Sequence, residues 1–248
     1  MLQWKVLLKF MLFLNIMFIG IGCNTSVNIK EVLPAVAEGN VAKLKKFLEK
    51  DPNLANLKIN NEETLLYQAV MFSQKEVVEL LISKGADVNE GTSPLVLATM
   101  AAELNVKEGQ INKDIAILLI SKGADVNAKD KNSLTPLHWV KNKEVAELLI
   151  SKGADVNAKD ENGLTPLHFI NNKEVAELLI SKGADVNAKS NDGTTPLHLV
   201  GNKEVAELLI LKGANVNTKN NLGKTPLDCA KENEKFEIID ILMKTVSK

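Results

Sequence analysis

The feature that most constrains the fold is a segment that returns every 30 residues. The tetrapeptide Thr-Pro-Leu-His begins at Thr135, Thr165 and Thr195, and a related Thr-Pro-Leu-Asp begins at Thr225. A second segment, Lys-Glu-Val-Ala-Glu-Leu-Leu-Ile, begins at Lys143 and recurs at the same step. Self-similarity at a fixed period of about 20–50 residues is the signature of stacked repeat units. The sequence therefore predicts a linear array of small units.

Each unit reads as two helices followed by an extended loop. Thr135 is a good helix N-cap, and Pro136 suits the first helical position, where a missing N–H costs nothing. A second helix is predicted from about Lys143, because apolar residues recur there at helical spacing. Gly153 ends it, since a residue just past a helix often needs positive φ. Neither helix can bury its apolar side alone, so neighbouring units must stack.

Gly-Ala-Asp-Val-Asn, a polar turn and then Thr-Pro-Leu-His closely resembles the ankyrin repeat. The resemblance covers residues 31–248 and implies an all-α ankyrin repeat solenoid of about seven helix-turn-helix units with extended β-turn loops. The first and last units are expected to be solvent-facing caps. The expected units are residues 31–60, 61–91, 92–129, 130–159, 160–189, 190–219 and 220–248.

Two departures from the repeat pattern predict local differences. Family repeats have about 33 residues, and the three missing here fall between the helices. Three residues is nearly one helical turn, so the first helix is predicted to be shortened by about a turn. The third unit is instead longer by an insertion within residues 94–113, predicted as a longer first helix over 95–104 and an exposed polar loop over 105–112. Neutral variation and a partner-specific feature are both compatible with this insertion.

The N-terminus is predicted to be a separate targeting segment. Residues 1–22 combine Lys5 and Lys9 with an apolar core over 10–19, which is typical of an export signal. Gly22-Cys23 resembles the lipobox of bacterial lipoproteins, which implies that Cys23 carries a lipid and that 23–30 form a short tether. The expected product is extracytoplasmic and attached to a membrane through this lipid. An uncleaved signal anchor, a soluble secreted form and a cytoplasmic protein are the alternatives.

Composition argues against several function classes. Every one of the 30 cations is lysine and the net charge is −1, so neither the arginine fork nor the positive field typical of nucleic-acid binding is present. The glycines fall singly at helix ends and turns, so no phosphate-binding loop is predicted. We expect no enzymatic activity, no cofactor and no small-molecule substrate.

The three histidines, His138, His168 and His198, recur at the repeat step. Stacked helices lie about 8–10 Å apart, whereas nitrogens that share a zinc ion lie within about 2.1 Å of it. No metal site is therefore predicted. The resemblance to ankyrin repeats implies that each histidine bonds locally and to the adjoining loop.

The resemblance also implies a protein partner of unknown identity, bound through the concave face and the loop tips. A passive structural envelope protein is the alternative, or a cytoplasmic regulator if residues 1–22 are not an export signal. The candidate binding positions are those that vary between copies while the framework does not: Lys131, Asn132, Leu134, Lys141, Glu161, Asn162, Leu164, Asn171, Asn191, Asp192 and Thr194.

Overall fold

The computed structural model describes residues 28–60, 62–100 and 106–246. Contacts divide the chain into an N-terminal unit, Met1–Pro94, and a C-terminal unit, Leu95–Lys248. Each unit is described by itself. The predicted export signal and Cys23 lie outside the described residues, as does part of the insertion at 101–105.

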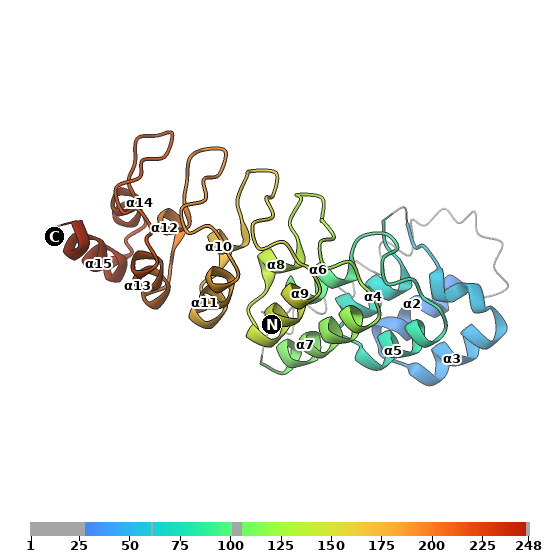
Figure 1. Ribbon diagram of the computed structural model, residues 1–248. Coiled ribbons are helices and arrows are strands. Elements are labelled where there is room, and N and C mark those ends of the chain that lie inside the picture. Colours follow the sequence, from blue (N-terminus) through green and yellow to red (C-terminus); the bar gives the residue numbers. More distant parts are fainter. Residues whose placement is uncertain (1–27, 61, 101–105, 247–248) are drawn as a thin grey trace. The chain divides into compact units, whose positions relative to one another are not determined.

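The N-terminal unit contains two helix pairs (Figure 1). The first pair is α2 (Ile29–Ala37) and α3 (Val41–Lys50), and a 3₁₀ turn, η1 (Pro52–Asn56), follows it. The second pair is α4 (Leu65–Met71) and α5 (Lys75–Ser83). Helix α2 packs on α4, and α3 packs on α5. Leucines such as Leu44, Leu65 and Leu81 are fully buried between them.

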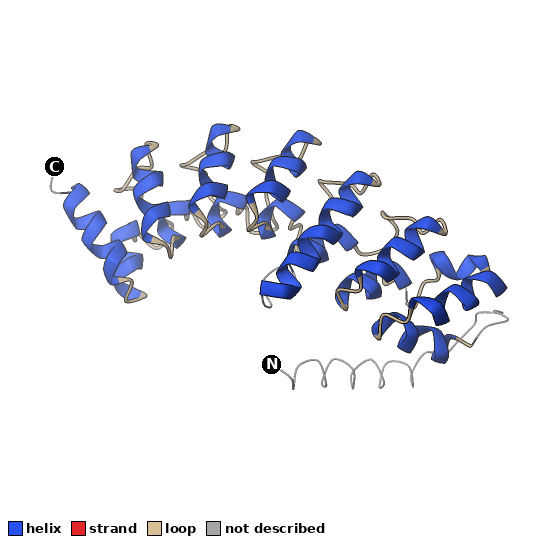
Figure 2. Cartoon of the chain, turned by 90° about the horizontal axis from the view of Figure 1, so that it is seen from below, coloured by secondary structure: helices blue, strands red, loops and turns tan. Residues whose placement is uncertain are grey.

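The C-terminal unit repeats this arrangement in two rows of helices (Figures 1 and 2). In the row of first helices, α8, α10, α12 and α14 pack one on the next, and in the row of second helices so do α7, α9, α11, α13 and α15. The described residues form seven helix pairs in all, which confirms the predicted all-α repeat fold. The helices of this unit are α6 (Pro94–Met100), α7 (Val106–Ser121), α8 (Pro136–Trp139), α9 (Lys143–Ser151), α10 (Pro166–Phe169), α11 (Lys173–Ser181), α12 (Pro196–Leu199), α13 (Lys203–Leu211), α14 (Pro226–Glu232) and α15 (Phe236–Val246).

Each copy of the repeat begins and ends its helices with the same residues. Thr165 and His168 form a capping box at the start of α10. The Asn172 side chain accepts a hydrogen bond from the Val175 amide at 3.0 Å and caps α11. Gly183, with φ +93°, then ends α11 in a left-handed conformation that a residue with a Cβ adopts only with strain. These local signals fix the length of each helix.

The shortened first helix is confirmed. Helices α8, α10 and α12 have 4 residues each, whereas α4 and α14 have 7. The loss is close to one turn, so the second helix keeps its apolar face toward the core, and Val145 and Leu149 are buried as Val77 and Leu81 are.

The exposed polar loop predicted over residues 105–112 was wrong, because the insertion lengthens the second helix. Helix α6 is described over Pro94–Met100, and the end of the longer first helix predicted over 95–104 lies outside the described residues. Helix α7 has 16 residues against 9 in α9, and Figure 2 shows it extending beyond the helices beside it. Residues 106–112 are therefore helical, and Asn112 is fully buried rather than in an exposed loop. Lys, Glu and Gln are good helix formers, and lengthening an existing helix requires no new nucleation.

Within the described residues, no helix combines the length and apolar character that a membrane span requires.

Candidate protein-interaction surface

The loops between successive repeats project from the stacked helices, and we call them fingers (Figure 1). An asparagine at the base of each finger joins it to the next. Asn157 Nδ2 donates to the Gly183 carbonyl at 2.9 Å, and its Oδ1 accepts from the Asp185 amide at 2.9 Å. Asn127 and Asn187 make the same pair of bonds to the following copy, and Asn56 does so in the N-terminal unit. The finger bases are thereby held in fixed register.

The tip of the second finger of the C-terminal unit is built around the buried carboxylate of Asp160. Asp160 Oδ1 accepts from the amides of Asn162 and Leu164 at 2.9 and 2.7 Å. Adjacent tips also bond to each other, since the Asn191 amide donates to the Asn162 carbonyl at 2.8 Å. The fingers therefore form a connected surface in the C-terminal unit.

The histidines bridge each first helix to the following finger, which confirms their predicted role. His168 Nδ1 accepts from the Thr165 amide at 3.0 Å, which leaves the ring proton on Nε2. Nε2 donates to the Thr194 carbonyl at 3.2 Å. His138 and His198 make the equivalent contacts with Leu164 and Lys224.

Burial lowers the pKa of all three histidines below the ordinary value of 6.5. The geometry requires the same direction, because a protonated Nδ1 would oppose the amide N–H that it now accepts. Among the described residues, no three His, Cys, Asp or Glu side chains are placed to share a metal ion. These rings are neutral hydrogen-bonding elements of the stack.

The structure places the predicted binding residues in three classes. Seven are exposed: Lys131, Lys141, Glu161, Asn162, Asn171, Asn191 and Asp192. Asn132 and Leu164 are half-buried. Leu134 and Thr194 are 7% and 6% exposed, so their side chains are not available to a partner, contrary to their selection. Both precede the N-cap threonine of a first helix, where the finger closes against the stack.

Sequence reasoning missed an apolar strip on the short helices. Trp139, Phe169 and Leu199 occupy the same position of α8, α10 and α12, and Leu199 is 43% exposed. The Trp139 and Phe169 rings lie 6.4 Å apart, and Trp139 Nε1 has no hydrogen-bond partner. These three residues read as core positions because they are apolar, but a helix of four residues buries few side chains beyond those of its first turn. Their shared position in a shortened helix is the signal that could have identified them.

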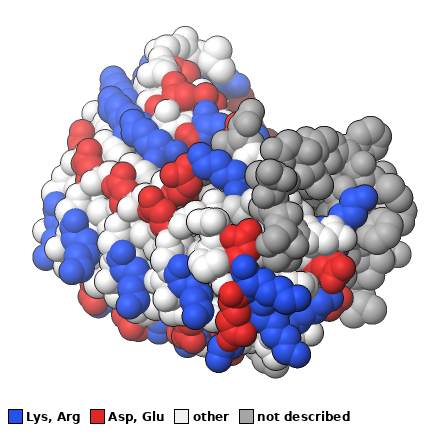
Figure 3. Space-filling view, turned by 90° about the vertical axis from the view of Figure 1, so that its right-hand side faces the viewer, with Lys and Arg blue, Asp and Glu red and all other residues white. Residues whose placement is uncertain are grey.

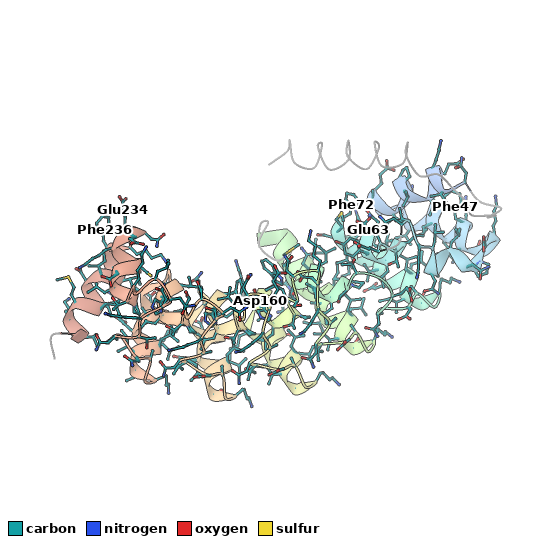
Figure 4. All side chains as sticks on the ribbon, turned by 90° about the horizontal axis from the view of Figure 1, so that it is seen from above. Phe47, Glu63, Phe72, Asp160, Glu234 and Phe236 are labelled. Carbon is teal, nitrogen blue, oxygen red and sulfur yellow. The ribbon has the colours of Figure 1, made fainter. Side chains whose placement is uncertain are left out.

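The Phe, Tyr and Trp side chains of the described residues are half-buried, except that of Phe236. None of them is fully buried, and the core consists of aliphatic residues. Phe236 is 73% exposed and projects from the end of the C-terminal unit beside Glu234 (Figure 4). Partly exposed aromatic residues are enriched where proteins contact each other.

Comparison with known proteins covers most of the chain. A family model of ankyrin repeats (3 copies) matches residues 33–130, 100–190 and 169–248. Among curated proteins, the human transient receptor potential cation channel subfamily A member 1 is 48% identical over 48 residues. That match covers 18% of this chain and 4% of the channel, so the chain spans a small part of that relative's length.

Proposed function

The chain belongs to the ankyrin repeat family, and from that premise we propose that it is a non-enzymatic scaffold that binds one protein partner through its fingers and first helices. One observation carries the proposal. The residues that vary between otherwise matching copies, such as Glu161, Asn191 and Asp192, are exposed on the fingers, whereas the hydrogen-bonded framework repeats. Rigid fingers with variable side chains suit specific recognition, because little order is lost on binding.

We further propose that the scaffold is exported and attached to a membrane by a lipid on Cys23. The support is the sequence of residues 1–23, with two lysines, an apolar core and Gly22-Cys23. Such an anchor would place the fingers on the extracytoplasmic side of a bacterial membrane.

Cross-linking in the native cell, followed by mass spectrometry, tests the scaffold function. We expect one protein to be cross-linked reproducibly to finger residues. A chain that cross-links to no protein would instead be the passive structural component. Cross-linking to cytoplasmic proteins would overturn the proposed export and support a cytoplasmic regulator.

Replacing Cys23 with serine should abolish incorporation of a clickable palmitate analogue in cells. Only a cysteine at the processing site receives the lipid, so the variant offers no acceptor. The chain has 2 cysteines, and Cys229→Ser is the matched control, which should label like the unmodified chain. Equal labelling of the Cys23→Ser variant and the unmodified chain would contradict the proposed anchor.

A further inference from the structure

Each of four successive fingers carries an exposed lysine at the same position. These residues, which we call the finger lysine row, are Lys129, Lys159, Lys189 and Lys219. Within the described part of the chain, none of the four has an ion-pair partner. Each lysine lies six residues before the N-cap threonine of the following first helix: Thr135, Thr165, Thr195 and Thr225. The row therefore lies in the loops that lead into the first helices.

The acidic residues of the same fingers are largely committed to the loops themselves. Asp130 and Asp160 each accept two backbone amides of their own tip. Asp192 accepts from the Ser190 hydroxyl at 2.5 Å and from the Thr194 amide at 3.1 Å. The lysine row faces solvent, while the carboxylates of Glu161 and Asp192 are exposed at the tips and those of Asp155 and Asp185 at the finger bases.

In the last finger, asparagine replaces aspartate at two positions and makes the same hydrogen bonds. Asn215 stands at the position of Asp185 and accepts from the Asn217 amide at 2.9 Å. Asn220 stands at the position of Asp160 and accepts from the amides of Leu222 and Lys224. Residues 212–224 consequently contain lysines and no Asp or Glu. The last finger is therefore the most positively charged of the four.

The lysines outside the fingers are of two kinds. On the second helices, Lys143 and Lys173 each lie 3.7 Å from a glutamate of the same helix. Figure 3 shows basic and acidic side chains in separate lines over the face in view. The lysines that follow the second helices are also exposed and, in the described part of the chain, outside ion pairs, so they form a second regular row with which the finger lysine row can be compared: Lys122, Lys152, Lys182 and Lys212.

We propose that the finger lysine row binds an acidic, extended segment of the protein partner that runs along the fingers. This inference rests on the proposed scaffold function and names the chemistry of the partner. Stacked repeats are about 10 Å apart, and an extended chain in the polyproline II conformation advances about 3.1 Å per residue with three residues per turn, so every third side chain lies on one face. Acidic residues at every third position would therefore meet successive lysines.

A protein segment fits this surface better than an anionic membrane does. Glu161 and Asp192 are exposed at the tips of the two middle fingers, next to the lysine row. A flat anionic bilayer would press against these carboxylates, whereas a narrow chain can lie along the lysines. The membrane is therefore an alternative outcome of the test.

The test measures binding of two fluorescent peptides to the full-length chain by anisotropy at low salt. The first is the ten-residue sequence Glu-Gly-Ser-Glu-Gly-Ser-Glu-Gly-Ser-Glu, and the second has the same composition with its glutamates adjacent. We expect the spaced peptide to bind more tightly, and added salt to weaken its binding because exposed charges are screened. Equal affinity for the two peptides would contradict the proposed extended register.

The decisive variant replaces all four lysines of the row with glutamine. Its matched control replaces another exposed lysine of each of the same four repeats, at the ends of α7, α9, α11 and α13: Lys122, Lys152, Lys182 and Lys212. Both variants lose the same charge, and far-ultraviolet circular dichroism checks that each is folded. We expect the row variant to bind at least about tenfold more weakly and the control within about twofold of the original, since each exposed pair contributes modestly.

Three outcomes would overturn the inference. An equal loss of affinity for the spaced peptide in the two variants would show a general charge effect. Binding to vesicles containing phosphatidylglycerol, without binding to the spaced peptide, would assign the row to a membrane. Cross-linking of a partner that is unchanged in the row variant would reject the acidic segment but retain the scaffold, whereas failure of all cross-linking rejects the scaffold function itself.

Discussion

Replacing Leu179 with alanine is expected to lower the free energy of unfolding by about 2–5 kcal/mol. Leu179 is 0% exposed in α11, which packs between α9 and α13. The substitution removes buried methyl groups and leaves a cavity that the flanking helices fill only in part. Urea unfolding of the full-length chain, followed by circular dichroism, measures the change.

Leu199→Ala is the matched control, because it makes the same chemical change where the side chain is 43% exposed. The expected loss in the free energy of unfolding is below about 1 kcal/mol, because the exposed Leu199 side chain buries less apolar area on folding than Leu179 does. Coupling in repeat proteins is mainly between neighbours, so Leu179→Ala should also separate unfolding into two transitions. A single transition with equal losses in both variants would contradict the packing described here.

The repeat copies explain why so much of the fold could be predicted. Thr165-Pro166 and Gly183 carry their own helix start and stop signals, and the structure places both where the sequence indicated. The shortened first helices followed from counting residues between these signals. Local capping and turn chemistry determine these features, so they require no knowledge of distant contacts.

Residues 105–112 show where such reasoning failed. Gly109 and the polar residues around it are typical of a loop. However, the end of a helix that projects past the adjacent helix needs no periodic apolar residues, because that end lies beyond the contact between the two helices. The buried Asn112 and the salt bridge from Lys113 to Glu144 of α9, at 2.6 Å, depend on tertiary packing. Local propensity could not show these contacts.

The candidate surface was predicted only in part, because the local sequence does not show which side chains tertiary contacts bury. Variable positions identified exposed finger residues such as Glu161, but Leu134 and Thr194 vary while remaining buried. The asparagine bonds between fingers join residues 26 to 31 positions apart. Their regular recurrence was visible in the sequence, whereas their partners became clear only once the repeats were stacked.

The second large expected effect comes from the histidines: the free energy of unfolding should fall in mild acid. Burial lowers the pKa of His138, His168 and His198 in the folded chain, so the unfolded chain binds protons more readily. Their contribution is complete above about pH 6.5 and is lost as the pH falls through the folded pKa values. Each histidine can add a slope of up to about 1.4 kcal/mol per pH unit within this window.

A triple variant with asparagine at all three positions tests this account. Asparagine can still accept a hydrogen bond locally, as Asp228 does from the Thr225 amide at 2.9 Å, but it is too short to replace the bond to the next finger. The Thr194 carbonyl keeps the Ser190 amide and hydroxyl as donors, so His168→Asn alone removes one hydrogen bond and should cost about 0.5–1.5 kcal/mol at pH 7.5.

Urea unfolding at pH 7.5, 6.5, 5.5 and 5.0 separates the two effects. The unmodified chain should become less stable across this series, and the triple variant should start lower but change much less. Asp192 and Asp228 also have lowered pKa values, because hydrogen bonds from Ser190 and from the Thr225 backbone stabilise their charged forms. Stability gained from these carboxylates is lost only below about pH 4, outside the series. A triple variant with the same pH dependence as the unmodified chain would therefore show that the neutral histidine bridges are not the source of acid sensitivity.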